Sequence, residues 1–282
     1  MRLTAKVKLL PTSEQTDDLR DTLEAANAAC NYISERAWQE QTFRQFSLHK
    51  LVYNDVREQF GLSAQVTVRC IAKVADAYKL DHKTKRSFRQ RGAIAYDNRI
   101  LSWKQGRQEV SIWTVKGRQT IPFASGEHQR ELLARQKGES DLALVDGEFY
   151  LLAACEAETP APDEVEQALG VDLGIVNIAT DSDGQIHSGA QVNSLRKRHA
   201  RLRSKLQSKG TKSAKRLLKK RRRKERRFAR NVNHVISKRI VEKAQGTARA
   251  IALEDLKGIR KRTTLRKSQR RQHHSWAFHD LR

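Results

Sequence analysis

The stretch Val171-Asp172-Leu173-Gly174-Ile175-Val176-Asn177-Ile178-Ala179 decides the fold, because it sets a carboxylate inside an apolar, β-branched run. A second run, Ala250-Ile251-Ala252-Leu253-Glu254, ends on another carboxylate. Short apolar runs of this kind predict buried strands. A buried carboxylate is costly unless it is paired or binds a metal. The two acids, separated by a very basic segment, therefore predict a divalent-metal site that faces a nucleic-acid backbone.

The positive charge of the chain is concentrated in its last third. Residues 191–282 hold 32 Lys and Arg against 5 Asp and Glu, whereas residues 1–190 hold 24 against 27, and the 282 residues together carry a formal net charge of +24. This distribution indicates a polyanion-binding surface. The alternative is a solvated basic face or a disordered tail. The positions expected to contact nucleic acid are Arg196, Lys197, Arg198, Lys219, Lys220, Arg221, Arg222, Arg223, Lys224, Arg226, Arg227, Lys257, Arg260, Lys261 and Arg262.

The composition also argues against several classes of protein. No apolar run reaches transmembrane length, so a membrane partner is not expected. Cys30, Cys70 and Cys155 are far apart, and no Cys-x-x-Cys pair occurs. This pattern excludes a local cysteine-rich zinc site and fits reduced thiols. We expect a cytoplasmic, nucleoid-associated protein.

The first part of the chain combines helices with short strands. Residues 2–10 alternate as a half-buried strand does, and Thr12 with Gln15 reads as a capping box at the start of a helix. Asp146-Gly147 is a favoured hairpin turn. We predict an α+β multidomain protein, in which a helical lobe is inserted into a small antiparallel β-barrel. The expected boundaries are 1–11 and 86–160 for the barrel, 12–85 for the helical lobe and 161–168 for a linker.

The second part, residues 169–282, reads as an α/β domain with a basic insertion. Two long helices are expected within 191–245, with a bend near Gly210, before the strand that leads to Glu254. Asp181 and Asp183 are most simply turn residues. Trp103 and Trp113 could stack on bases, although the barrel core is the expected place of Trp113.

Four features of the chain stand in a familiar order and spacing. They are the segment Val171–Ile175, the basic helical pair, the segment Ile251–Leu256, and Ser275-Trp276-Ala277-Phe278. Together they resemble TnpB (OrfB), a transposon-encoded family related to type V CRISPR nucleases. The front half is similar too, so the resemblance covers nearly the whole chain.

The resemblance implies a function for each part. The barrel would be a wedge domain and the helical lobe a recognition lobe, and together they would hold a guide RNA paired with target DNA. Residues 169–282 would be a partial RuvC-type, RNase H-like nuclease domain. Asp172 and Glu254 match the family's first two catalytic acids, which hold Mg²⁺ for phosphodiester cleavage. Gly174 would let a nucleic-acid backbone approach the strand.

The sequence also departs from the family. The two Cys-x-x-Cys pairs and the third catalytic acid do not occur. On a continuing strand, Asp255 would face away from Glu254, and Asp280 is expected at the surface. We therefore expect a C-terminally truncated relative in which RNA-guided DNA binding is kept and cleavage is lost. The alternatives are a non-catalytic guide-RNA/DNA-binding module or repressor, and, more remotely, a general basic RNA-binding protein.

Structural roles remain open for several of these residues. Asp172 could be a hydrogen-bonded buried acid, and Glu254 a surface residue of an edge strand. His273, His274 and His279 lie beside a basic stretch, where nucleic-acid contact or plain exposure is expected rather than a metal site.

Overall fold

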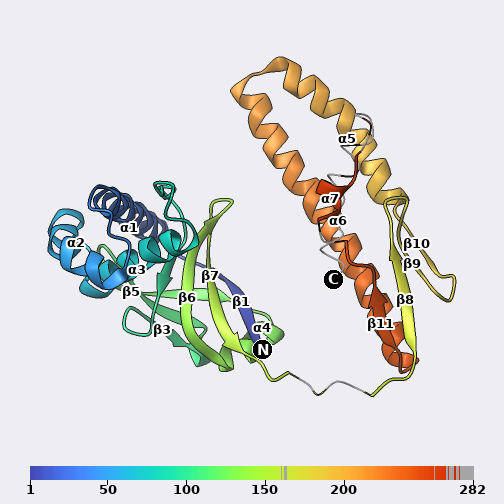
Figure 1. Ribbon diagram of the computed structural model, residues 1–282, viewed down its shortest axis with the longest axis horizontal. Coiled ribbons are helices and arrows are strands. Elements are labelled where there is room, and N and C mark those ends of the chain that lie inside the picture. The colour runs from blue at the N-terminus through green and yellow to red at the C-terminus, as the bar shows by residue number, and fades with distance from the viewer. Residues whose placement is uncertain are drawn as a thin grey trace. The chain divides into compact units, whose positions relative to one another are not determined.

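The computed structural model describes residues 1–159, 161, 164–256, 258–264, 266, 270 and 273. The chain divides into two compact units, Met1–Pro160 and Ala161–Arg282 (Figure 1). The mixed α+β class that the sequence predicts is confirmed.

The first unit contains a bundle of helices. Its long members are α1 (Ser13–Gln39), α2 (Gln45–Phe60) and α3 (Ala64–Leu80). The predicted capping box begins α1, because the Thr12 side chain accepts a hydrogen bond from the Gln15 amide while the Gln15 side chain accepts one from the Thr12 amide. Gly61 ends α2 at a φ of 59°, a left-handed conformation that favours glycine.

The sheet of the first unit is a nearly closed antiparallel barrel. Its strands are β1 (Arg2–Leu9), β2 (Ile94–Tyr96), β3 (Leu101–Lys104), β4 (Glu109–Thr114), β5 (Gly117–Ala124), β6 (Gln136–Val145) and β7 (Glu148–Glu156), in the order β2-β6-β7-β1-β5-β4-β3. β1 pairs with both β5 and β7, so the first strand joins the barrel as expected. The short helix α4 (Glu127–Ala134) connects β5 to β6.

The core of the first unit joins helices and barrel. Tyr78 of α3 and Tyr96 of β2 are both 1% exposed, and the Tyr96 hydroxyl donates to the Trp113 carbonyl at 3.0 Å. Trp113 is half-buried and packs against this core. Trp103 packs edge-on against Phe123, with ring centroids 5.3 Å apart. Both tryptophans thus contribute to the barrel.

The second unit is built on a four-stranded sheet. Its strands are β8 (Ala168–Leu173), β9 (Asn177–Asp181), β10 (Ile186–Ser188) and β11 (Ala250–Leu253), in the order β10-β9-β8-β11. The first three form an antiparallel meander, and β11 runs parallel to β8. Between β10 and β11 the chain forms the long helices α5 (Ala190–Lys209) and α6 (Lys212–Gly246), joined at Gly210 in a left-handed conformation. A short helix, α7 (Ile259–Arg262), follows.

The core of the second unit lies on one face of this sheet. Leu169, Val171 and Leu173 of β8 pack in one cluster with Ile236 and Ile240 of α6. Because side chains alternate along a strand, Gly170 and Asp172 belong to the other face. Asp172 is accordingly exposed, and β11 is exposed along most of its length. The prediction that both runs form buried strands is therefore wrong for β11 and for the Asp172 carboxylate.

Candidate metal and nucleic-acid site

The structure brings Asp172 of β8 next to Glu254, the residue that directly follows β11. Leu253, the last residue of β11, is paired with Val171 of β8, so the next residue of each chain segment is one of the two acids. The Leu173 amide donates a hydrogen bond to Glu254 Oε1 at 3.3 Å. The parallel pairing thus joins two carboxylates that are 82 positions apart in the sequence.

The donor set of this acid pair fits a hard divalent cation. Both acids are exposed, and within the described part of the chain the Asp172 carboxylate makes no hydrogen bond or ion pair. Carboxylate oxygens are the ligands that Mg²⁺ prefers. Two carboxylates on adjacent strands repel each other, and a bound cation would relieve that repulsion. Among the described residues, no third His, Cys, Asp or Glu joins them in a group that could hold a metal ion.

The structure corrects the expectation for Asp255 and adds a local reason for Gly174, whose contact with nucleic acid stays a prediction. β11 ends at Leu253, so Glu254 and Asp255 both follow the strand, and the alternation that would turn Asp255 to the opposite face does not apply. Gly174 has a local explanation, because a Cβ there would lie 2.6 Å from the Asn177 carbonyl oxygen. The glycine is therefore required by the tight connection between β8 and β9, whether or not a nucleic acid approaches.

An ion cluster secures the other end of the two parallel strands. Lys243 of α6 contacts Asp181 at 2.6 Å and Asp183 at 2.9 Å. Arg249, which directly precedes β11, donates to both carboxylate oxygens of Asp183 at 2.9 and 2.7 Å. The Asp181 carboxylate also accepts from the amides of Asp183 and Gln185, as a turn residue does. The cluster fixes α6 and the start of β11 to the turn between β9 and β10.

The charges of this cluster shift the pKa of its acids. Hydrogen bonds from Arg249 and Lys243 hold the pKa of Asp183 well below its usual range. Burial raises the pKa of Asp181, but its hydrogen bond with Lys243 and those with the Gln185 and Asp183 amides outweigh burial, and the net pKa is lowered. Both acids therefore lose their proton at a lower pH than an unperturbed aspartate does.

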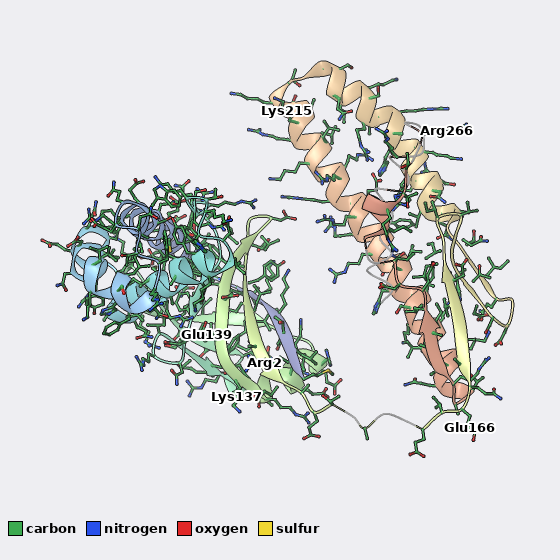
Figure 2. The ribbon with its side chains drawn as sticks, in the orientation of Figure 1. Arg2, Lys137, Glu139, Glu166, Lys215 and Arg266 are labelled. Carbon is green, nitrogen blue, oxygen red and sulfur yellow. The ribbon has the colours of Figure 1, made fainter. Side chains whose placement is uncertain are left out.

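The basic residues line the helical pair that extends from this sheet. α5 and α6 together carry 22 Lys and Arg against two acids, Glu225 and Glu242. Figure 2 shows side chains ending in nitrogen along both helices, with Lys215 near their connection. Of the positions expected to contact nucleic acid, those that are exposed are Lys197, Arg198, Lys219, Lys220, Arg221, Arg222, Lys224, Arg226, Arg227 and Arg262. Arg196 and Arg223 are half-buried.

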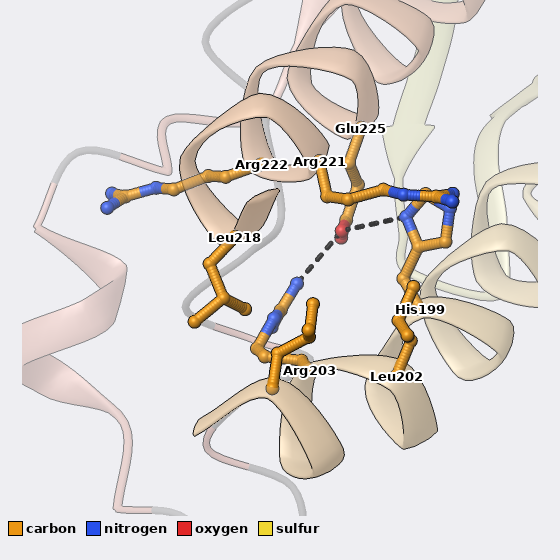
Figure 3. A pocket seen from close by; sticks show the side chains of 8 residues that line it. His199, Leu202, Arg203, Leu218, Arg221, Arg222 and Glu225 are labelled. Carbon is orange, nitrogen blue, oxygen red and sulfur yellow. Dashed lines mark hydrogen bonds and ion pairs between the residues drawn. The ribbon is translucent and has the colours of Figure 1, made fainter. Parts of the chain in front are cut away.

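One acid organises the interior of the basic pair. Glu225 of α6 contacts Arg203 of α5 at 2.9 Å and His199 Nδ1 at 3.4 Å, and its side chain is only 16% exposed (Figure 3). These residues line a small pocket between the helices, together with Leu202, Leu206, Leu218, Arg221 and Arg222. Burial lowers the pKa of Arg196, an effect that the charge of Glu225 opposes.

Several predicted residues lie outside the described part of the chain. These are Lys257, the side chains of Arg260 and Lys261, and His274, His279 and Asp280, together with the helix expected to begin at Ser275. Their assignments stay predictions, as do the metal-binding and nucleic-acid-binding roles of the residues described above. Among the described residues, no helix is long and apolar enough to cross a membrane.

Sequence reasoning missed the partners of Asp181, Asp183 and Glu225. The turn that the sequence predicts for the two aspartates is present, but the cations that pair with them come from residues about sixty positions later in the chain. Glu225 could have been singled out, because it is the single acid between Lys212 and Val241. A lone acid inside a dense basic run is typical of an internal ion pair.

Comparison with known proteins gives a family match over part of the chain and matches to solved structures. Residues 152–260 match the family OrfB_IS605, described as a probable transposase. A Cas12f1 chain from a cryo-EM structure of a Cas12f1-sgRNA-target DNA complex matches with a TM-score of 0.55 and 10% identity, over 96% of this chain and 72% of that one. A chain of a CRISPR-Cas12f ternary complex matches with a TM-score of 0.35 and 11% identity, over 94% and 68%. No curated protein matches the sequence.

Proposed function

We propose that this chain, a TnpB-like relative with a fold similar to that of Cas12f, is a transposon-associated protein that binds DNA under the direction of a guide RNA. Base pairing between guide and target would give sequence choice, while the protein holds the heteroduplex through its backbone. Guide RNA and target DNA are therefore the proposed partners.

The observation that carries this proposal is the position of the basic helices beside the acid pair. α5 follows β10 and α6 precedes β11, so both helices are joined to the sheet beside which Asp172 and Glu254 are neighbours. Most of the Lys and Arg side chains of the two helices are exposed. A solvated helix face would not require such a charge density. Exposed Lys and Arg along two long helices suit phosphate contacts, which position a nucleic acid without reading its sequence.

We assign the second unit to the RNase H-like class, with RuvC-type ancestry. The support is its strand order, in which an antiparallel meander is extended by a fourth strand parallel to the first. Asp172 and Glu254 would hold Mg²⁺, which when bound would activate a water and stabilise a leaving oxygen. The residues themselves supply carboxylate oxygens, and the Leu173 amide orients one of them.

The proposed activity is binding without appreciable cutting. A two-metal displacement needs ligands that bridge and orient both ions, and the described residues bring two carboxylates together. A related candidate is an RNA-guided endonuclease, favoured by the retention of both acids. Measuring Mg²⁺-dependent cleavage of a matched DNA by the chain with its guide separates the two, because robust cleavage would show the endonuclease to be correct.

The proposal is tested by the RNA that the chain retains. The protein would be expressed together with the DNA that flanks its own gene, purified at moderate salt, and its bound RNA sequenced. A single discrete RNA encoded beside the gene supports guide binding. A broad mixture of cellular RNA would indicate a general basic RNA-binding protein, and absence of RNA would contradict the proposal.

A further inference from the structure

The outward face of α2 carries a stripe of aromatic and basic side chains, Phe46, His49, Lys50, Tyr53 and Arg57, which we call the α2 stripe. Their spacing of three or four residues sets them on one face of the helix. α2 packs against α1 and α3 and lies on the outer side of the helical bundle of the first unit (Figure 1). Phe46, Lys50 and Arg57 of the stripe are exposed, whereas His49 and Tyr53 are half-buried and Tyr53 also packs against the edge of the core.

The side chains of the stripe are already arranged as stacked pairs. The His49 and Tyr53 rings stack with centroids 4.5 Å apart and an interplanar angle of 21°. Lys50 Nζ lies 4.7 Å from the centroid of the Phe46 ring, and the Arg57 guanidinium carbon lies 6.0 Å from that of Tyr53. Aromatic faces beside cations are thus repeated along about three turns of the helix.

Packing of the protein itself does not explain the Phe46 ring of the stripe, which lies outside the core cluster that Tyr53 joins. The core face of α2 is formed by Leu48, Val52 and Val56, each fully buried. Phe46 is 72% exposed and adds little to that core. Removal of an exposed apolar ring from water is favourable, so a complex with a partner that covers the ring would be stabilised by this burial.

The charge of the stripe indicates the kind of partner that would bind it. The stripe holds two permanent cations, Lys50 and Arg57, and a histidine. Of the acids of α2, Asp55 accepts a hydrogen bond from the Tyr32 hydroxyl at 3.2 Å, and Glu58 falls outside the spacing of the stripe. A surface that offers ring faces and positive charge, and no acid, is complementary to unpaired bases on a phosphate backbone.

We propose that the α2 stripe is a stacking surface for the bases of a single-stranded nucleic-acid segment, with Phe46 and Tyr53 as the stacking rings and Lys50 and Arg57 as phosphate contacts. The inference deepens the proposed function and rests on it, because it names the form of nucleic acid that the first unit would take. It differs from phosphate binding by α5 and α6, which needs no accessible base.

The test compares two strands that differ only in their bases. Binding of the full-length chain to a labelled oligothymidine and to an abasic strand of the same length is measured at high salt, where phosphate contacts weaken. The double variant Phe46→Ala/Tyr53→Ala should bind oligothymidine about five-fold or more weakly and the abasic strand unchanged. The variant Phe46→Trp should keep the wild-type preference. Leu80→Ala, which removes an 89% exposed apolar side chain elsewhere in this unit, is the matched control and should change neither affinity.

Other outcomes would overturn the inference. Equal weakening on both strands would mean that the variant acts through charge or folding, and unchanged binding to oligothymidine would remove the stacking role. A fall in oligomeric state of the double variant in sedimentation, with unchanged strand binding, would assign the stripe to a second protein copy. If the double variant keeps its affinity for oligothymidine and also retains the guide RNA, the stripe proposal fails and the proposed function is unaffected.

Discussion

Replacing Arg221 and Arg222 with alanine should flatten the salt dependence of RNA binding. Both residues are exposed and lie in the first third of α6, and the Arg222 guanidinium points away from the other side chains that line the pocket (Figure 3). Each lost phosphate contact lowers the log–log salt slope by about 0.7 on a single strand and about 0.9 on a B-form duplex. The double variant should therefore reduce the slope by about 1.5, from a wild-type magnitude on the order of 5 or more.

The assay is a salt titration of RNA affinity, followed by fluorescence anisotropy. A control with the same loss of charge is Lys79→Ala/Lys137→Ala, because these lysines are paired with Asp76 at 2.8 Å and Glu156 at 3.1 Å in the first unit. The control should leave the slope nearly unchanged. Equal slopes for all three proteins, or a wild-type slope near zero, would refute the assignment of α6 as a phosphate-binding helix.

Three further predictions concern metal binding, pH and stability. Mg²⁺ at about ten times its Kd should add about 1.4 kcal/mol to the free energy of unfolding of the wild type, measured by thermal melting, and should add nothing to Asp172→Asn; equal Mg²⁺ effects on both would exclude this acid as a ligand. Arg249→Ala should lower Tm at neutral pH, and the difference in Tm from the wild type should close as pH falls below about 4. The pKa of Asp183 is lower in the folded than in the unfolded chain, so its ion pair stabilises the fold above the unfolded pKa and this stabilisation is lost on acidification. A Tm difference that does not depend on pH would contradict this. Glu225→Gln should lower the free energy of unfolding by about 1–3 kcal/mol in urea denaturation, since it weakens the contacts of the buried His199 and the half-buried Arg203. Glu242→Gln, from an exposed pair, should lower it by less than about 1 kcal/mol; similar costs would remove the organising role of the interior acid.

Local signals in the sequence predicted local structure well. The capping box of Thr12 and Gln15 and the turn at Asp146-Gly147 occur where they were expected, because each depends on a few neighbouring residues. The run Val171–Ala179 forms two strands, β8 and β9, where one was predicted, because the chain turns at residues 174–176. The run that leads to Glu254 forms β11, and the basic segment is helical. These features follow from propensity and capping, which act over one or two turns of chain.

The contacts that build the site could not be predicted in the same way. Apolar runs alone indicate burial, but which face of a sheet a helix covers is decided by tertiary packing, so the exposure of Asp172 was missed. The parallel pairing of β8 with β11 depends on a chain reversal through two helices. The pairing of Lys243 and Arg249 with acids of the β9–β10 turn has no periodic signal at all.

The most direct test of RNA-guided DNA binding is reprogramming. The chain would be purified with its own RNA, the segment of that RNA that pairs with DNA would be replaced, and binding would be measured to two labelled duplexes, one matching the original segment and one matching the new one. Affinity should move with the RNA, so that the recoded complex binds the new duplex and no longer binds the old one. Unchanged preference, or equal binding to both duplexes whatever RNA is bound, would contradict it.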